Sequence, residues 1–446
     1  MDKNQLSRRN FLGKSALIGA AGVIGMSALS SCSGKTKTVD YAFPPLPDLA
    51  PDGKPLKAGL VGCGNRGTGA ALNFLAAGHD LHLVALADVF EDKVWDCRNK
   101  LMKQRVEIPE QNCFWGFDAY KELMTLDLDV VILATPPHFR PMHFDAAVQA
   151  KKNVFLEKPV CVDPVGARQI IATAKKAENL GLTVITGTQR RHQRDYLETY
   201  KQVAGGAIGD LVAAKAFWMQ SHVWFRTREE GWSDMEYMLR NWNNFCWLCG
   251  DHILDTHVHN IDIINWFMGK HPEEAVGFGG RAHRLTGDQY DFFSIDFDFG
   301  NGIFSHSFSR QIDGCANQLG ELIMGTEGYT NCKNTIYNPD GSVKWTYEYP
   351  KDKDGRSTGV VKVSPYIQEH IHLVTAIRTN TPVVEAERTA ISTLTAIMGR
   401  TAAYTGQKVT WEEMMTSNMK LGPEKYEMGP VDMEFPVPVP GTAHKA

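Results

Sequence analysis

The sequence predicts an α/β chain in which an N-terminal Rossmann domain, a doubly wound parallel sheet, is followed by an α+β domain with a large open, mostly antiparallel sheet. A glycine-rich turn joins a strand to a helix early in the first domain, strands and helices alternate after it, and consecutive strand-like segments follow Gly209. The 446 residues are too many for one ordinary domain. The predicted parts are a signal (1–32), a linker or arm (33–55), the Rossmann domain (56–187), the second domain (188–411) and a tail (412–446).

The composition is that of an ordinary soluble globular protein, with 43% hydrophobic and 22% charged residues. The 47 basic and 51 acidic residues give a net charge of −4, which offers no electrostatic reason to expect nucleic acid as a partner. Nine cysteines are too few and too scattered for a disulfide-dense scaffold.

The N-terminus reads as a targeting segment. Arg8 and Arg9 precede a short apolar run, 16–29, which is too short for a comfortable membrane span. The paired arginines resemble a twin-arginine export signal, and residues 29–32 resemble a lipobox in which Cys32 is lipidated. A plain secretory signal cleaved nearby is the alternative. We therefore predict a periplasmic protein, exported by the twin-arginine route and touching the membrane only through a lipid anchor at Cys32.

The predicted first strand, 56–62, runs into Gly62-Cys63-Gly64-Asn65-Arg66-Gly67 and then a helix, 68–77. In this setting the first glycine permits a tight turn, the second lets a pyrophosphate approach the backbone, and the third lets helix and strand pack closely. The motif predicts a dinucleotide site. The candidate cofactor contacts in this turn are Gly62, Gly64, Asn65, Arg66 and Gly67, with Arg66 alternatively a solvated side chain.

Asp88 ends the second predicted strand, 81–87, at about the spacing of an acid that binds the adenosine ribose. A carboxylate there accepts hydrogen bonds from the ribose hydroxyls and repels a 2′-phosphate, which favours NAD over NADP. The alternative is that Asp88 only caps the helix beginning near Glu91.

The α/β alternation continues to the end of the first domain. Ligands of such sheets bind beyond the carboxyl ends of the strands, where Thr135, Pro136 and His138 follow one strand and Glu157 and Lys158 the next. The predicted elements are strand 129–134, helix 141–150, strand 153–156, helix 163–179 with Asp163 as N-cap, and strand 182–186.

From Gly209 the pattern changes to strands, with a hairpin turn signal at 298–302. The tail 429–446 contains four prolines and is predicted to be an arm or a disordered end. The predicted strands are 211–224, 276–283, 292–299, 303–310 and 318–324, and the predicted helices are 255–268, 366–379 and 387–405.

Together the glycine turn, Thr135-Pro136-Pro137, Glu157-Lys158-Pro159 and the block 250–262 resemble the Gfo/Idh/MocA family of oxidoreductases, over about Leu56 to Trp411. The resemblance implies an enzyme that oxidises or reduces a sugar or polyol carbon. It implies that Lys158 contacts both nicotinamide and substrate, that Pro159 is often cis, that Asp255 contacts the substrate hydroxyl and that His259 is the general base. It also implies that Thr135, Pro136, His138 and Glu157 lie at the cofactor.

Helical spacing gives independent support to this pair. If the block is helical, His259 lies ~40° from Asp255 around the helix, while His257 lies ~160° away. A carboxylate and an imidazole one turn apart suit proton transfer. A hydrogen-bonded buried pair, a metal site and an interface helix remain alternatives, although His252, His257, His259, Asp255 and Asp262 do not share one face, and no metal is predicted.

Further substrate contacts are predicted at the domain junction and among the aromatics before Asp255. Arg190 and His192 follow the last strand of the first domain, although a basic turn fits equally. Arg240 and Trp242 are candidates for binding sugar hydroxyls and stacking on the ring, as are Trp224, Phe225 and Trp247, for which packing is the alternative. Cys246 and Cys249 are interpreted as small buried residues.

The predicted function is an exported NAD(P)-dependent oxidoreductase that acts on a sugar or glycoside hydroxyl. Because free NAD is scarce outside the cytoplasm, we expect the cofactor to be tightly bound. One alternative is an NAD-dependent glycoside hydrolase that uses transient oxidation and elimination. Another is a non-catalytic carbohydrate-binding lipoprotein. By analogy with open-sheet relatives we expect a homo-oligomer, a dimer or tetramer.

Overall fold

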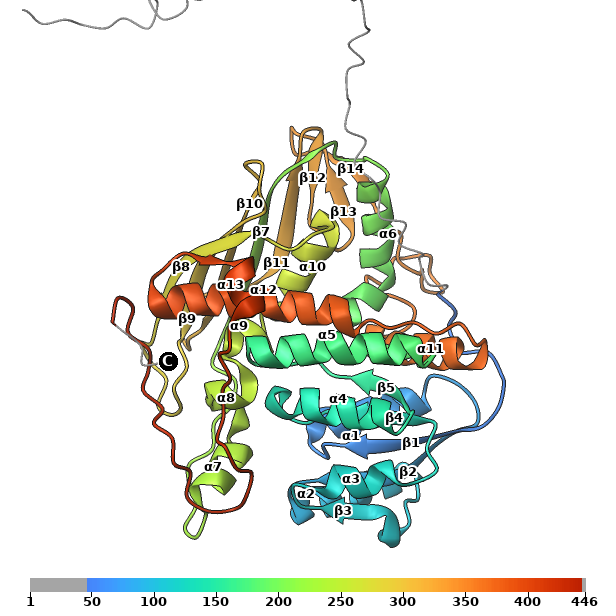
Figure 1. The fold of residues 1–446 in the computed structure, drawn as a ribbon. Helices are drawn as coiled ribbons and strands as arrows, with labels where there is room; N and C mark the ends of the chain where they lie inside the picture. Colours follow the sequence, from blue (N-terminus) through green and yellow to red (C-terminus); the bar gives the residue numbers. More distant parts are fainter. Residues whose placement is uncertain (1–45, 443–446) are drawn as a thin grey trace, which may run out of the picture. The chain divides into compact units, whose positions relative to one another are not determined.

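The computed structural model describes residues 46–442 (Figure 1). The predicted signal, with Arg8, Arg9 and Cys32, and most of the predicted linker lie outside the described residues. The predictions of export, lipidation and periplasmic location therefore stay predictions. Between residues 46 and 442, none of the helices combines the length and the apolar character that crossing a membrane requires.

The first sheet is fully parallel, with the strand order β3-β2-β1-β4-β5-β6. This is the doubly wound order in which the chain direction across the sheet reverses between β1 and β4, so that a crevice forms at the carboxyl ends of these strands. The predicted Rossmann fold is thereby confirmed. Its strands are β1 (Leu56–Val61), β2 (Leu81–Asp88), β3 (Cys113–Trp115), β4 (Val130–Leu133), β5 (Asn153–Leu156) and β6 (Val184–Thr186).

Helices cover both faces of this sheet. One face packs on α3, α4 and α5, and the other on α1, α2 and α11, a helix from the far end of the chain. Helix α5 begins as predicted, because the Asp163 side chain accepts a hydrogen bond from the Gly166 N–H at 2.7 Å. The helices are α1 (Asn65–Leu75), α2 (Glu91–Met102), α3 (Ala119–Met124), α4 (Arg140–Gln149), α5 (Pro164–Asn179) and α11 (Pro365–Arg378).

The second sheet has nine strands in the order β14-β13-β12-β11-β7-β10-β9-β8-β15. Only β7 and β10 pair in parallel, so the sheet is mixed but mostly antiparallel, as predicted. The strands are β7 (Leu211–Gln220), β8 (Glu274–Gly280), β9 (Phe292–Asp298), β10 (Phe304–Gln311), β11 (Gln318–Gly325), β12 (Gly328–Thr330), β13 (Thr335–Tyr337), β14 (Val343–Thr346) and β15 (Val409–Thr410).

Helices cover one face of the second sheet and leave the other face open. Phe293, Ile295 and Phe297 of β9 point toward α10 and α12 and are fully buried, whereas Val276 and Phe278 of β8 are exposed on the opposite face. The remaining helices are α6 (Arg194–Ala204), α7 (Asp234–Arg240), α8 (Cys246–Cys249), α9 (His252–Asp255), α10 (Val258–Met268), α12 (Ala386–Thr405) and α13 (Trp411–Thr416).

The predicted helix 255–268 is wrong at its start. It is broken into α9 and α10 at Thr256 and His257, so Asp255 and His259 do not lie on one continuous helix. The break places Asp255 at a helix end, where backbone carbonyls lack intrahelical partners and are free to accept other donors. His257 is held by a hydrogen bond between its Nε2 and Ser307 Oγ at 2.8 Å.

The tail, as far as residue 442, is an arm that contacts both domains. The Leu421 N–H donates to Asp163 (2.9 Å), and Tyr426 Oη hydrogen-bonds His138 Nε2 (2.8 Å). The Met235 N–H at the start of α7 donates to the carbonyl of Gly429 (3.1 Å). Of the two alternatives for the tail, the described part is therefore the arm.

Candidate active site

The glycine turn has the backbone that a dinucleotide needs. Gly62 has a φ of +101°, and a Cβ there would lie 2.6 Å from the Ala134 carbonyl carbon. A Cβ on Gly67 would lie 1.8 Å from the Gly62 oxygen, so only glycine allows this close packing. A Cβ on Gly64 would meet no atom within 4 Å. The turn is thus tight where it packs and open where a pyrophosphate would approach the N-terminus of α1.

This turn lines a cavity of about 650 Å³, a size typical of cofactor pockets. The Rossmann side of the cavity includes Asp88 and Phe90 after β2, Phe117 after β3, and Thr135 and Pro136 after β4. A second wall comes from residues 224–226 and 239–242 of the other domain. The predicted contacts in the glycine turn, Asp88, Thr135 and Pro136 therefore lie around one cavity, and these residues fit a bound dinucleotide.

Asp88 supports the turn and faces the cavity at the same time. Its two carboxylate oxygens accept hydrogen bonds from the backbone N–H groups of Cys63 (2.7 Å) and Phe90 (3.0 Å). Burial raises the pKa of this carboxyl group, while both N–H donors oppose the rise. The N-cap residue of α2 is Phe90, and no side chain caps this helix. Asp88 therefore does not act as the N-cap of α2, which was the alternative.

Arg66 lines the dinucleotide cavity, so its predicted phosphate contact stays a prediction, and its guanidinium is also held in ion pairs. Its Nε donates to Glu157 Oε1 at 2.5 Å and its Nη2 to Glu369 Oε1 at 3.2 Å, and its guanidinium lies 4.9 Å from the centre of the Tyr366 ring. Both glutamates are buried. Arg66 therefore links the glycine turn to the end of β5 and to α11, and its positive charge is paired with both carboxylates. Glu157 supports the glycine turn through this ion pair, and its predicted contact with the cofactor stays a prediction.

Lys158 reaches from the Rossmann domain to the second domain. It follows β5 in a cis peptide bond to Pro159, as the resemblance implies. Its Nζ donates to the backbone carbonyl of Asp255 at 2.5 Å. Burial lowers the pKa of this ammonium and the guanidinium of Arg140 adds to the effect, while the carboxylates of Asp255 and Glu157 oppose it. The Lys158 ammonium thus lies at the domain junction, and it loses its proton more readily than an exposed lysine does.

His259, in the first turn of α10, is 9% exposed and stacks on the indole of Trp218, with ring centres 6.0 Å apart. Burial, followed by the charges of Lys158 and Arg190, lowers the pKa of His259 well below its ordinary value. The ring is therefore neutral near pH 7 and able to accept a proton. Among residues 46–442, neither the His259 ring nor the Asp255 carboxylate has a hydrogen-bond partner.

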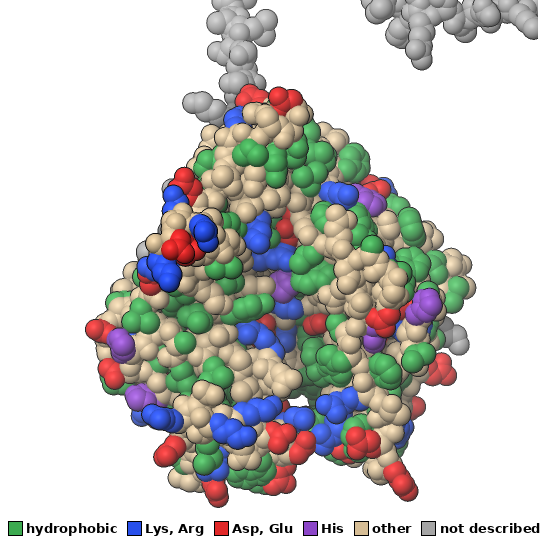
Figure 2. Space-filling model, turned by 180° about the vertical axis from the view of Figure 1, so that it is seen from behind, with side chains coloured by type: hydrophobic (Ala, Val, Ile, Leu, Met, Phe, Trp, Pro, Cys, Tyr) green, Lys and Arg blue, Asp and Glu red, His purple; other side chains and the backbone are tan. Residues whose placement is uncertain are grey.

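Arg190 lies near His259, whose pKa its positive charge lowers. Its guanidinium pairs with Glu321, donates to Asn260 Oδ1 at 3.1 Å and lies 5.4 Å from the centre of the Trp218 ring. Sequence reasoning missed Trp218 because it sits inside the predicted strand 211–224, where an aromatic is ordinary packing. A hollow near the middle of the rear face contains Lys and Arg side chains and a histidine (Figure 2).

Other predicted contacts lie elsewhere. His192 is 2% exposed, its Nδ1 meets His372 Nδ1 at 2.6 Å, and its Nε2 is 3.4 Å from Glu385. Arg240 and Trp242 line the dinucleotide cavity. His138 is bonded to Tyr426 and is absent from the cavity wall, and burial lowers its pKa to about 4.

The alternative of a metal site and the interpretation of the two cysteines concern residues that the structure describes. Between residues 46 and 442, no three His, Cys, Asp or Glu side chains are grouped to hold a metal ion. Cys246 and Cys249 are free and buried, as interpreted from the sequence. Trp247, between them, is 2% exposed and belongs to the core.

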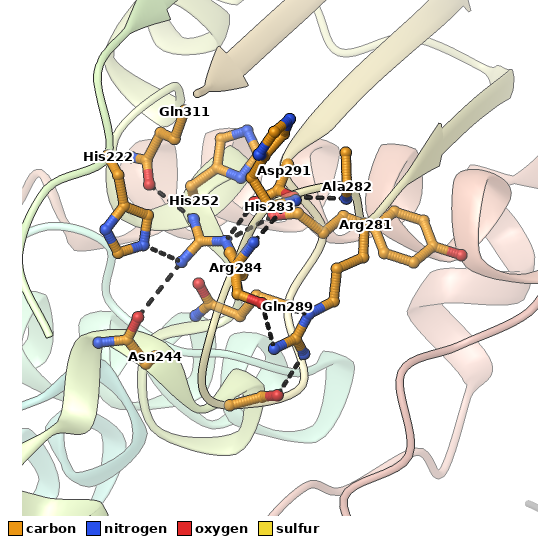
Figure 3. Close-up of polar contacts among 12 residues, drawn as sticks. His222, Asn244, His252, Arg281, Ala282, His283, Arg284, Gln289, Asp291 and Gln311 are labelled. Atoms are coloured by element: carbon orange, nitrogen blue, oxygen red, sulfur yellow. Dashed lines mark hydrogen bonds and ion pairs between the residues drawn. The ribbon is translucent and has the colours of Figure 1, made fainter. Parts of the chain in front are cut away.

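A buried arginine supports the elements around Asp255 (Figure 3). Arg284 donates to Gln311 Oε1 (2.6 Å) and Asn244 Oδ1 (3.3 Å), and its Nε is 3.3 Å from the Asp291 carboxylate. Gln311 in turn donates to Thr256 Oγ1 (3.2 Å), at the break between α9 and α10. One guanidinium therefore fixes β10, the helix break and the segment that walls the dinucleotide cavity.

Comparison with protein families agrees with this geometry. Residues 56–186 match the oxidoreductase family with an NAD-binding Rossmann fold, and residues 196–330 match the GFO/IDH/MocA C-terminal domain, together more than half of the chain. The chain belongs to the Gfo/Idh/MocA family. An NAD-binding Rossmann domain and a family oxidoreductase fold are therefore established for it.

Curated relatives in this family match about half of the chain. An uncharacterized oxidoreductase of Streptococcus pneumoniae is 28% identical over 48% of this chain and 56% of its own length. A myo-inositol 2-dehydrogenase of Thermotoga maritima is 26% identical over 50% and 58%. A glycosyl hydrolase family 109 protein of Shewanella pealeana is 24% identical over 49% and 47%. The chain thus spans little more than half the length of the first two.

Solved structures extend the likeness in fold. An aldose-aldose oxidoreductase of Caulobacter crescentus has a TM-score of 0.61 at 17% identity, covering 80% of this chain and 100% of that one. A scyllo-inositol dehydrogenase of Lactobacillus casei, with bound NAD(H) and scyllo-inositol, has a TM-score of 0.59 at 20% identity, covering 80% and 99%. At these identities the likeness concerns the fold alone.

Proposed function

We propose that this protein is an NAD-dependent oxidoreductase acting on a CH–OH group of a sugar, polyol or glycoside. The observation that carries the proposal is the hydrogen bond from Lys158 of the Rossmann domain to the backbone carbonyl of Asp255 of the second domain, beside His259, whose pKa the Lys158 charge lowers. Oxidation of a hydroxyl-bearing carbon needs a base for the hydroxyl proton and a hydride acceptor on the other side of the carbon. A bound nicotinamide dinucleotide would supply the hydride acceptor.

The roles follow from the chemistry of the three side chains. Neutral His259 accepts the hydroxyl proton. The Lys158 ammonium donates a hydrogen bond to the oxygen as it becomes a carbonyl and stabilises the charge that develops there. The Asp255 carboxylate, which has no partner among the described residues, accepts a hydrogen bond from a substrate hydroxyl and orients it.

The dinucleotide is proposed to be NAD. A 2′-phosphate beside Asp88 would meet a carboxylate whose two oxygens already accept N–H donors, whereas ribose hydroxyls can donate to its remaining lone pairs. The substrate is proposed to be sugar-like because a partly exposed indole, Trp218, stacks beside the base. The names of curated relatives, an inositol dehydrogenase among them, support this substrate class.

Two measurements test the proposal. Bound nucleotide is released by denaturation and identified, and the protein is then screened against sugars, polyols and glycosides for the absorbance change of reduced nicotinamide. We expect NAD and turnover with at least one cyclic polyol or sugar. Absence of nicotinamide binding would refute the proposal, and nucleotide without hydride chemistry on any carbohydrate would favour a non-catalytic carbohydrate-binding protein.

A second candidate is an NAD-dependent glycoside hydrolase, favoured by the relative named as a glycosyl hydrolase family 109 protein. Transient oxidation of one ring carbon acidifies its neighbour, so that the leaving group departs by elimination. The same His259 and Lys158 would serve both reactions. Product analysis on a glycoside separates them, because a hydrolase gives free sugar and a dehydrogenase gives a keto-glycoside.

The cellular setting and assembly are also proposed. Export by the twin-arginine route with a lipid anchor at Cys32 rests on the N-terminal sequence. A homo-oligomer is supported by the open sheet face, where Phe278 is 64%, Val276 51% and Phe304 48% exposed. Membrane fractionation of a Cys32→Ala variant and light scattering of the mature protein test these two proposals.

A further inference from the structure

We propose that residues 222–245 of the second domain, here named the lid, bind the adenosine half of the dinucleotide and hold it in place through a clamp between Arg240 and Asp92. The inference rests on the proposed binding of a dinucleotide in this cavity. It assigns cofactor binding to residues outside the Rossmann domain. It also gives the expected retention of the cofactor a specific structural cause.

The lid forms one wall of the cavity. It contributes Trp224, Phe225, Arg226, Arg240 and Trp242 to the wall. Arg240 of the lid contacts Phe90 and Asp92, which follow β2, where the Rossmann fold binds the adenosine ribose. The lid therefore covers the adenosine half of the site, whereas the reacting groups, Lys158 and His259, do not line this cavity.

Two aromatic side chains of the lid are exposed where they line the cavity. Trp224 is 40% and Phe225 45% exposed, although both line the cavity, and Trp242 stands edge-on to Trp224 with ring centres 6.1 Å apart. Large apolar surfaces that converge on a pocket normally meet a ligand. A planar adenine offers them a stacking partner, and Arg226 beside them supplies a cation for the phosphates.

The clamp joins the lid to the Rossmann domain. The two Nη atoms of Arg240 donate to the two carboxylate oxygens of Asp92, at 2.9 and 3.1 Å, and its Nε donates to Glu236 at 2.9 Å. Its guanidinium also lies 3.9 Å from the centre of the Phe90 ring. A two-point pair between a guanidinium and a carboxylate has a fixed geometry and is stronger than a single contact. Opening the lid breaks both the pair with Asp92 and the contact with Phe90.

The lid keeps its own shape. The buried Asn241 accepts hydrogen bonds from the Arg226 N–H (2.8 Å) and from Asn244 Nδ2 (2.9 Å), and Asn244 also donates to the Trp224 carbonyl (3.1 Å). These bonds hold the aromatic residues at fixed positions relative to α7. The lid is therefore one hydrogen-bonded unit.

The base of the lid is fixed to the rest of the second domain. Arg284 donates to Asn244 (Figure 3), and Asp234 accepts a hydrogen bond from the Val431 N–H of the tail at 3.3 Å. Phe435 of the tail packs on Phe245, with ring centres 5.7 Å apart. A lid fixed at its base and clamped at its far side by Arg240 releases a nucleotide slowly, and the clamp is the part whose loss changes this rate most.

The test compares dissociation rates of NAD from the whole protein loaded with NAD. The variants are Arg240→Met and Asp92→Asn, and the control is Lys176→Met, which removes an ion pair within the Rossmann domain (with Asp145, 3.0 Å) that lies outside both the lid and the cavity wall. Release is followed by NAD retained through gel filtration and by protein fluorescence after dilution. We expect both clamp variants to release NAD about tenfold faster or more, and the control to match wild type.

The double variant Arg240→Met/Asp92→Asn is expected to release NAD no faster than either single variant, because the two residues form one contact. Equal rates in wild type, both clamp variants and the control would overturn the inference while leaving the proposed function intact. Failure of the wild type to bind NAD would instead overturn the proposed function. If Arg240→Met does not fold, Asp92→Asn at the half-exposed partner tests the same contact.

Discussion

The ammonium of Lys158 and the backbone carbonyl of Asp255 lie 2.5 Å apart, and this hydrogen bond joins the end of β5 to the end of α9. The first element belongs to the Rossmann domain and the second to the other domain, so each domain contributes part of the candidate reaction centre. The helix break after Asp255 provides the free carbonyl. Any change that separates the domains also separates Lys158 from Asp255 and His259.

Replacing Lys158 by Met is expected to lower kcat/KM by about 10³-fold, because the developing charge on the substrate oxygen loses its donor. Arg is not expected to rescue activity, since its planar guanidinium is larger and its proton is held too tightly. Steady-state kinetics with the substrate found by screening measures both. The NAD content of the purified variants serves as the control and should equal that of wild type. Activity of Lys158→Met within tenfold of wild type would exclude the proposed role.

Replacing Arg190 by Met is expected to shift the acid limb of the kcat/KM profile toward higher pH. Burial is the main cause of the low pKa of His259, and the positive charges of Lys158 and Arg190 add to it. Without the Arg190 charge the imidazolium is less disfavoured, so the pKa of His259 rises and the base is protonated at a higher pH. Arg190→Lys keeps the charge and is the matched control. An unmoved limb in Arg190→Met, equal to that of Arg190→Lys, contradicts the electrostatic role.

Replacing Trp218 by Leu is expected to raise KM for a sugar about tenfold, while Trp218→Phe stays within about threefold of wild type. The indole stacks on His259 and is partly exposed, so it offers a flat apolar face next to the base. Phenylalanine keeps such a face, although it loses the Nε1 hydrogen bond to Gln220. Initial-rate kinetics over a range of sugar concentrations distinguishes the two. Equal KM values for the Leu and Phe variants would show that the ring does not contact substrate.

Local signals made much of the first domain predictable. The glycine turn and the Asp163 cap are each encoded within a few neighbouring residues, and both form as expected. Contacts between distant residues could not be foreseen in this way. Arg66 pairs with Glu369, which is 303 positions away on α11, and this depends on a late helix covering the Rossmann sheet. The break at Thr256 and His257 depends on Gln311 and Ser307 of β10.

In the candidate site too, residues with local sequence signals were predictable, and residues defined by distant contacts were not. Lys158 and Asp88 were predictable because each follows a strand whose carboxyl end must face the crevice. Arg240 was assigned to the substrate from its residue type, but the structure pairs it with Asp92 on the nucleotide side. The lid could not be predicted from the sequence, because the residues that Arg240 contacts, Asp92 and Phe90, lie in the other domain.

The buried His257 predicts a specific loss of stability in acid. Burial, with the nearby His252 and Arg190, lowers its pKa to about 3 in the folded protein. The unfolded chain binds a proton near the ordinary histidine value of about 6.5, so below that pH the unfolded state takes up a proton that the folded state does not. The stability due to neutral His257 is thus fully present above about pH 6.5 and is lost progressively as pH falls toward about 3.

Urea unfolding at about pH 7.5 and about pH 5 measures this effect, which amounts to about 2 kcal/mol for one such histidine over that interval. In His257→Gln the difference in unfolding free energy between the two pH values should be smaller by that amount, even if the variant is less stable at both. His82→Gln, at an exposed position of β2, is the control and should keep the wild-type difference. Because the comparison is between pH values within each variant, lost packing at position 257 cancels. An unchanged pH difference in His257→Gln would mean that His257 is not buried in its neutral form beneath the active site.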